Sequence, residues 1–122
     1  MASKHKKKKT VLLVKLHGHQ SEHGIPYDPK FLSLALFYLE ACANTDLSVR
    51  NGIEFRVRLF DAAGDSEAIL RSIYKEKPDA VAYSSYLSEF LKTVEVARKV
   101  GLVLPDALRI IGGPSVRYPE KF

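Results

Sequence analysis

The chain has 122 residues, 46% of them hydrophobic, which indicates one small domain with a hydrophobic core and excludes disorder throughout. Its apolar runs are much shorter than the about 18 residues of a membrane-spanning helix, and the N-terminus does not resemble a secretory signal, so we expect a cytoplasmic protein. Five of the 19 Lys and Arg residues precede residue 10, which leaves 14 against 14 Asp and Glu residues, so the net charge of +5 comes from the N-terminus.

We expect residues 1–9 to form a disordered basic tail that aids solubility. The alternative is loose contact with RNA, which would weaken steeply with added salt. The rest of the chain is formally neutral, whereas nucleic-acid-binding domains carry a basic patch on the folded surface. We therefore place one domain at residues 10–122 and do not expect nucleic acid as a main partner.

The first predicted elements are a strand and a helix. Thr10–Leu16 is almost continuously apolar, which is typical of a strand buried on both faces of a parallel sheet. A loop at 17–28 follows, and Asp28 can cap a helix over about Pro29–Ala43. Cys42, the single cysteine, lies in this helix, so we expect a core side chain. The predicted inward face of the helix comprises Phe31, Leu34, Ala35, Tyr38, Leu39 and Cys42.

A second strand and helix follow a polar connection at Asn44–Gly52. Ile53–Phe60 alternates strictly between apolar and polar residues, which predicts a half-exposed strand at a sheet edge. Asp65 can cap a helix that continues to about Glu76 and ends at the Lys-Pro pair after it. Its predicted inward residues are Ile69, Leu70 and Ile73.

The last predicted elements are a short strand at Ala80–Ser84, a helix over about Glu89–Val103 and a strand at Ala107–Ile111. The apolar residues of this last strand indicate burial. They are Leu108, Ile110 and Ile111. The predicted inward face of the helix comprises Phe90, Leu91, Val94, Ala97 and Gly101.

This order of elements predicts an α/β fold, with a Rossmann- or flavodoxin-like parallel sheet and helices on both faces. In the spatial order 2-1-3-4, the alternating second strand takes one edge and the fourth strand takes the other. An uncovered apolar edge strand is an aggregation hazard. We therefore expect a domain that lacks a fifth strand and last helix: a fragment, or a chain completed by a partner that covers the fourth strand.

The common phosphate-binding loops and the acidic pair of a phosphoacceptor domain are absent from the sequence. In open α/β sheets, ligands bind outside the carboxyl ends of the strands. Glycines after the fourth strand let a ligand approach the backbone, and serines after the third offer hydroxyl groups, although Ser85 or Ser88 could instead cap the next helix. The candidate binding residues are His17, Gly18, His19, Tyr27, Ser84, Ser85, Tyr86, Gly112, Gly113 and Pro114.

Three histidines crowd the first loop: His17, His19 and His23. Imidazoles bind transition metals, but a structural zinc site needs four ligands, and only Glu22 and Asp28 lie nearby as oxygen donors. We therefore expect no dedicated metal site, and histidines that line the loop or donate hydrogen bonds to a ligand.

With these motifs the chain resembles the N-terminal cobalamin-binding domain of the B12-dependent radical SAM enzymes. The resemblance covers roughly residues 10–119. Its most specific parts are Pro78–Ser84, within the stretch Lys-Pro-Asp-Ala-Val-Ala-Tyr-Ser-Ser, and the Gly-Gly-Pro that ends the stretch Arg-Ile-Ile-Gly-Gly-Pro at 109–114. It also includes the Gly-Ile-Glu-Phe-Arg-Val segment that begins at Gly52.

The resemblance implies cobalamin with its nucleotide tail extended into the carboxyl edge of the sheet. Ser84 and Ser85 would contact the tail or corrin, the segment Gly112–Pro114 would flank the tail, and the loop His17–Tyr27 would face the corrin ring. The D-x-H-x-x-G motif of classical B12 domains is absent, which argues against histidine ligation.

The iron–sulfur cysteine triad is also absent, because the chain has one cysteine. The resemblance therefore implies a methyltransferase-type module that is not catalytic alone, with S-adenosylmethionine and the cluster in a missing downstream domain. The alternative is an interaction module of the same fold that no longer binds cobalamin and contacts RNA through its lysine tail.

Overall fold

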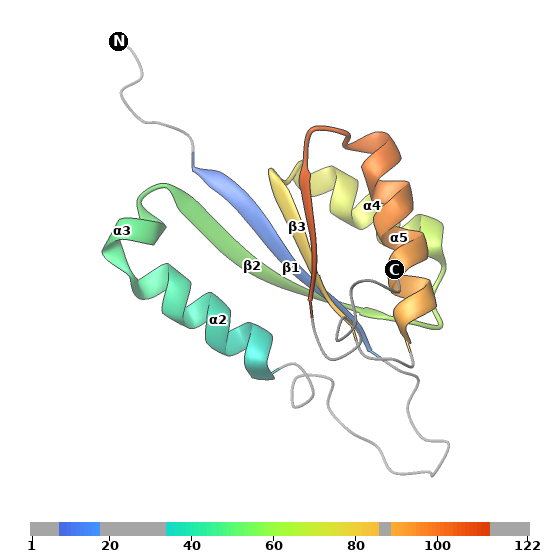
Figure 1. The fold of residues 1–122 in the computed structure, drawn as a ribbon, viewed down its shortest axis with the longest axis horizontal. Helices are drawn as coiled ribbons and strands as arrows, with labels where there is room; N and C mark the ends of the chain where they lie inside the picture. The colour runs from blue at the N-terminus through green and yellow to red at the C-terminus, as the bar shows by residue number, and fades with distance from the viewer. Residues whose placement is uncertain (1–7, 18–33, 86–88, 113–122) are drawn as a thin grey trace, which may run out of the picture.

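Four parallel strands form one sheet in this computed structural model, which describes residues 8–17, 34–85 and 89–112 (Figure 1). The spatial order is β2-β1-β3-β4. The prediction of an α/β, Rossmann- or flavodoxin-like sheet with this order is confirmed. The strands are β1 (Lys9–His17), β2 (Ile53–Asp61), β3 (Ala80–Ser84) and β4 (Leu108–Gly112).

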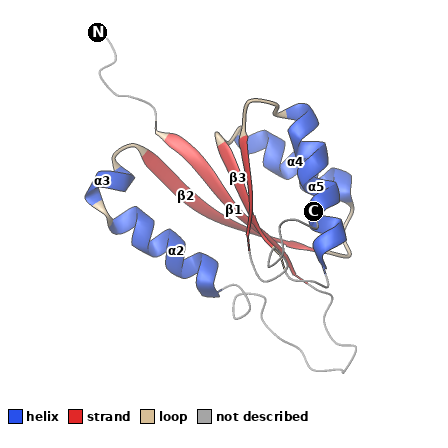
Figure 2. Ribbon diagram, viewed as in Figure 1, coloured by secondary structure: helices blue, strands red, loops and turns tan. Residues whose placement is uncertain are grey.

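Helices cover both faces of the sheet (Figure 2). The helices α4 (Ser66–Glu76) and α5 (Phe90–Val103) lie on one face, and α2 (Leu34–Thr45) packs on the other. A short helix, α3 (Leu47–Arg50), lies where a polar connection was expected. Asp46 explains it, because its side chain accepts a hydrogen bond from the Ser48 N–H at 2.9 Å and caps the turn.

The main core lies between the sheet and the pair α4 and α5. From α4 it takes Ile69 and Ile73, with Leu70 packed at its margin, which confirms the predicted inward face. Asp65 caps α4 as predicted, and Lys77 ends it in the left-handed conformation, with φ 48°. The other core residues are Leu12, Val14, Leu16, Val81, Tyr83, Val96, Ala97 and Val100.

In the predicted inward face of α5, Ala97 is confirmed as buried, but Leu91 is wrong, and the buried face is rotated by part of a turn. Leu91 is 82% exposed, whereas the buried residues of this helix are Thr93, Val96, Ala97 and Val100. Thr93 can occupy the core because its hydroxyl donates to the Glu89 carbonyl at 2.8 Å. Thr93, whose hydroxyl forms a hydrogen bond within its own helix, is thus buried where the apolar pattern predicted that neighbouring residues would be buried.

The predicted inward face of α2 is also wrong. Leu36 is buried and Phe37 packs beside it, against Leu13 and Val57 of the sheet. The predicted residues Ala35, Tyr38, Leu39 and Cys42 are exposed instead. Phe31 and the side chain of Leu34 lie outside the part that the structure describes.

Two polar side chains explain this rotation of α2. Asn44 bonds to both backbone groups of Phe55, donating to its carbonyl at 3.0 Å and accepting from its N–H at 3.2 Å. One turn earlier, the Glu40 carboxylate accepts from the N–H of Val57 at 2.9 Å. These bonds satisfy the outer edge of β2, whose backbone would otherwise be open to pairing with another chain.

Because Cys42 is exposed, we predict that its thiol reacts in the folded protein. A dithionitrobenzoate reagent should label about one thiol per chain without denaturant, and the signal is unambiguous because there is one cysteine. The denatured chain gives the control for complete reaction. Labelling that requires denaturant would contradict this position of the helix.

The fourth strand occupies the edge that the sequence predicts, but its apolar residues are not buried. Leu108 is 62% exposed, Ile110 46% and Ile111 37%, because no described element lies beyond this strand. Within residues 8–17, 34–85 and 89–112, no helix has both the length and the apolar character needed to cross a membrane.

Candidate functional site

A row of side chains crosses three strands at the carboxyl edge of the sheet. The parallel register pairs Lys15 of β1 with Ser84 of β3, and Ser84 with Gly112 of β4. Register partners in a parallel sheet share a face, so these residues lie on the α2 side with Leu13 and Ala82. The structure therefore places two of the candidate binding residues, Ser84 and Gly112, side by side.

Ser85 joins the ends of β3 and β4. Its N–H donates to the Gly112 carbonyl at 2.9 Å, and the residue is buried. The helix α5 begins at Phe90 with Glu89 in the N-cap position, so Ser85 is not the capping residue of that helix. The capping alternative for Ser88 lies outside the described residues.

Gly112 leaves open space at the end of β4. A Cβ built on it meets no atom within 4 Å, and its φ lies outside the left-handed region. Neither packing nor backbone conformation among the described residues therefore requires glycine at this position. What its missing side chain provides is room beside Ser84.

Lys15 is a member of the row that our sequence reasoning missed. Its side chain is 2% exposed, and burial lowers the pKa of its ammonium, while attraction to Glu89 opposes that shift. Glu89 is itself buried at the start of α5. The sequence does contain a sign of this, because Lys15 interrupts a strand that is otherwise apolar. A lysine at such a position either buries its ammonium group or extends it into solvent at the end of the strand.

The lowered pKa of Lys15 makes a sign-specific prediction about stability. Between the folded-state pKa and the ordinary 10.5, the unfolded chain binds more protons, so the contribution of Lys15 to stability rises with pH. The difference in unfolding free energy between the wild type and Lys15→Met should therefore move in favour of the wild type from about pH 7 to about pH 10. Urea unfolding at several pH values measures it.

Lys99 supplies the control for this pH series. Its hydrogen bond to Glu67 raises the pKa of Lys99, so its stabilising effect is fully present below the ordinary 10.5 and is lost only above it. The difference between the wild type and Lys99→Met should therefore stay level over the same window. A level difference for Lys15→Met as well would contradict the burial of its charge.

Tyr83 lies on the opposite face of the sheet, under α5. Its hydroxyl is buried and has no hydrogen-bond partner in the described part of the chain. Burial raises the pKa of Tyr83 strongly, and attraction between the phenolate and Arg109 offsets only part of this rise. Tyr83 is therefore held as a neutral phenol near neutral pH and does not supply a phenolate base.

Of the other predicted site residues, only His17 is described. It lies two residues beyond Lys15 on β1, its carbonyl accepts from the Ala62 N–H at 2.9 Å, and it pairs in register with Asp61. The described ranges contain no cluster of three or more His, Cys, Asp or Glu side chains that could hold a metal ion. The residues outside the description are Gly18, His19, His23, Tyr27, Tyr86, Gly113 and Pro114.

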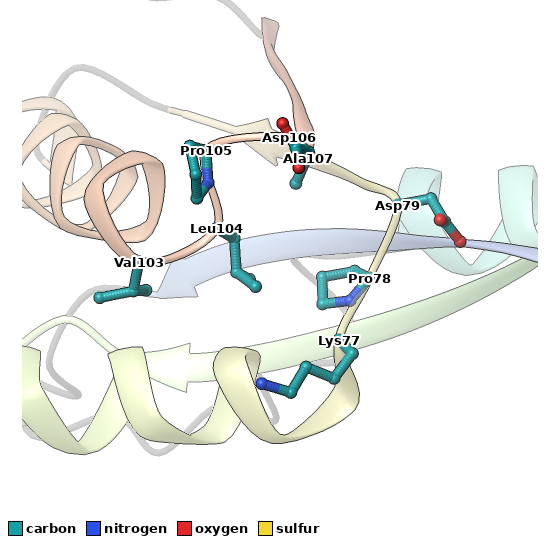
Figure 3. A pocket seen from close by; sticks show the side chains of 8 residues that line it. All are labelled: Lys77, Pro78, Asp79, Val103, Leu104, Pro105, Asp106 and Ala107. Carbon is teal, nitrogen blue, oxygen red and sulfur yellow. The ribbon is translucent and has the colours of Figure 1, made fainter.

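A pocket of about 270 Å³ lies at the opposite, amino end of the sheet (Figure 3). It is formed where the connection after α4 meets the connection after α5, with Lys77 and Pro78 on one side and Pro105 on the other. The Asp79 carboxylate accepts from the Thr10 N–H at 2.8 Å, so it already ties β1 to this connection. The pocket is thus remote from the row at the carboxyl edge.

Two comparisons with known proteins identify no relative of this chain. No protein-family model matches the chain. A search of curated proteins finds no match either.

Proposed function

We propose that this chain is a cobalamin-binding module of a B12-dependent radical SAM enzyme of the methyltransferase type. The observation that carries the proposal is the junction of β3 and β4, where Ser84 lies beside Gly112 and Ser85 bonds to the same glycine at 2.9 Å. Both strands end there in small residues, at the edge where open α/β sheets bind their ligands.

The described residues fit the nucleotide tail of cobalamin. The tail joins a flat benzimidazole ring to a polar ribose phosphate. The ring needs a narrow space free of large side chains, and the ribose phosphate needs hydrogen-bond donors such as hydroxyl groups. Gly112 leaves that space, and Ser84, which is only partly buried, lies beside it in the strand register. When bound, cobalamin supplies the methyl-transfer chemistry, and this chain contributes binding and orientation of the cofactor.

The cellular setting that we propose is the cytoplasm. The chain carries one free, exposed cysteine, which is compatible with a reducing compartment, where thiols persist without forming disulfides.

Equilibrium dialysis against hydroxocobalamin tests the binding function. We expect saturable retention of the corrin absorbance by the chain and no retention by the urea-unfolded chain. Absence of saturable binding by the folded chain would overturn the proposal. Binding of an RNA oligonucleotide in its place, weakened by added salt, would favour the interaction module instead.

A further inference from the structure

The two edges of the sheet differ in how their backbone groups are satisfied. On β2, side chains of α2 bond to the outward groups of Phe55 and Val57. On β4, the Leu108 N–H donates to Asp79 at 3.0 Å and the Gly112 carbonyl accepts from Ser85 at 2.9 Å, both towards β3.

The backbone of a strand alternates its hydrogen-bonding direction from one residue to the next. Because Leu108 and Gly112 bond inward, the N–H and C=O groups of Arg109 and Ile111 point away from β3. In the described part of the chain, no group pairs with them. The edge of β4 is therefore a template for one more strand.

Side chains on the two faces of β4 differ in chemistry. Leu108 and Ile110, 62% and 46% exposed, share the α2 side of the sheet with Ala80 and Ala82. Arg109 lies on the α5 side together with Ile111. A strand added here would thus meet an apolar surface on one face and a partly cationic one on the other.

A groove of about 320 Å³ lies on the cationic side, between β4 and α5. Its two polar lining residues, Arg98 and Arg109, are both guanidinium groups. The Arg109 side chain lies against Gly101 of α5, where the missing Cβ makes room for it. The remaining lining residues are apolar: Val94, Ala97 and Ile111.

We propose that the β4 edge binds an extended segment of a partner polypeptide that alternates apolar and acidic residues. The segment adds a fifth strand by bonding to the backbone of Arg109 and Ile111. Its apolar side chains cover Leu108 and Ile110. Its acidic side chains enter the groove and pair with Arg98 and Arg109, since guanidinium groups bind carboxylates in a bidentate geometry.

Charge disfavours a second copy of this chain as the occupant. Antiparallel pairing of two β4 strands would place both copies of Arg98 and Arg109 on the same face of one continuous sheet. Like charges opposed across a strand pair destabilise the pairing. An acidic segment removes that repulsion and replaces it with attraction.

The probe is a short fluorescein-labelled peptide that alternates valine and glutamate, and fluorescence anisotropy with the full chain measures its binding. Two comparison peptides replace glutamate by lysine, or carry N-methyl groups on the backbone amides that face the strand. We expect each to bind at least about tenfold more weakly, a difference of about 1.4 kcal/mol. Equal binding of the glutamate and lysine peptides would overturn the proposal.

Matched variants distinguish binding at this site from nonspecific electrostatic attraction between the peptide and the protein. Arg98→Glu should weaken binding of the glutamate peptide at least about tenfold, and so should Ile110→Lys. Two exposed residues away from the edge are controls: Arg71→Glu on α4 and Leu91→Lys on α5 should leave the affinity for this peptide unchanged. An unchanged affinity in Arg98→Glu, with thermal unfolding confirming its fold, contradicts the proposal. So does a dimer in sedimentation velocity that Ile110→Lys dissociates, because a second copy then occupies the edge.

Discussion

Replacing Gly112 by valine should weaken cobalamin binding at least about tenfold, equivalent to about 1.4 kcal/mol, while leaving the fold intact. Among the described residues, a Cβ at this position meets nothing within 4 Å, and the backbone φ lies outside the left-handed region, so we expect the described fold to tolerate the change. The branched side chain would instead fill the space beside Ser84 that we assign to the nucleotide tail. Equilibrium dialysis against hydroxocobalamin measures the loss.

Gly52 offers the matched control for this variant. A Cβ on Gly52 also meets nothing within 4 Å, but this glycine lies at the opposite edge of the sheet, immediately before β2. Gly52→Val should therefore bind cobalamin like the wild type. Urea unfolding of both variants checks that neither loses stability. Wild-type affinity in Gly112→Val would place the ligand elsewhere.

The second large effect is expected from Leu36→Ala, which should lower the free energy of unfolding by about 2–3 kcal/mol. Leu36 is 7% exposed and packs against Leu13 and Val57, so truncation leaves a cavity between α2 and the sheet. The midpoint and slope of urea unfolding, followed by circular dichroism, measure the change.

Leu39→Ala is the matched control, because it makes the same chemical change three residues later in the same helix. Leu39 is 55% exposed, so its truncation should cost less than about 0.5 kcal/mol. The two substitutions have the same effect on helix propensity, and their difference isolates packing. A larger loss in Leu39→Ala than in Leu36→Ala would restore the inward face that the apolar pattern predicts.

Part of the candidate site was predictable from the sequence. The predicted position of Ser84, Ser85 and Gly112 follows from two facts: each ends or directly follows a predicted strand, and parallel strands end at the same edge of a sheet. Lys15 was not predicted, because its importance depends on burial. Only the folded structure shows that Lys15 is 2% exposed and in register with Ser84.

The sequence by itself determined the order of strands and helices, the α/β class and the edge positions of β2 and β4. These follow from local periodicity and from the rules for parallel connections, which depend on neighbouring residues in the chain. Only the tertiary structure shows which faces of α2 and α5 are buried, whereas the inward face of α4 followed from its apolar pattern. The helix α2 is apolar on several sides, so its pattern left the rotation open.

The bonds from Glu40 and Asn44 to the edge of β2 set that rotation, because they satisfy backbone groups of a strand that lies more than ten residues away in the sequence. In α5, Thr93 enters the core by bonding to its own helix. In both helices a polar side chain with a hydrogen-bond partner took an inward position that an apolar pattern assigns to its neighbours. Such partners exist only once the chain has folded, which is why the sequence pattern predicted α2 and α5 but not which of their faces is buried.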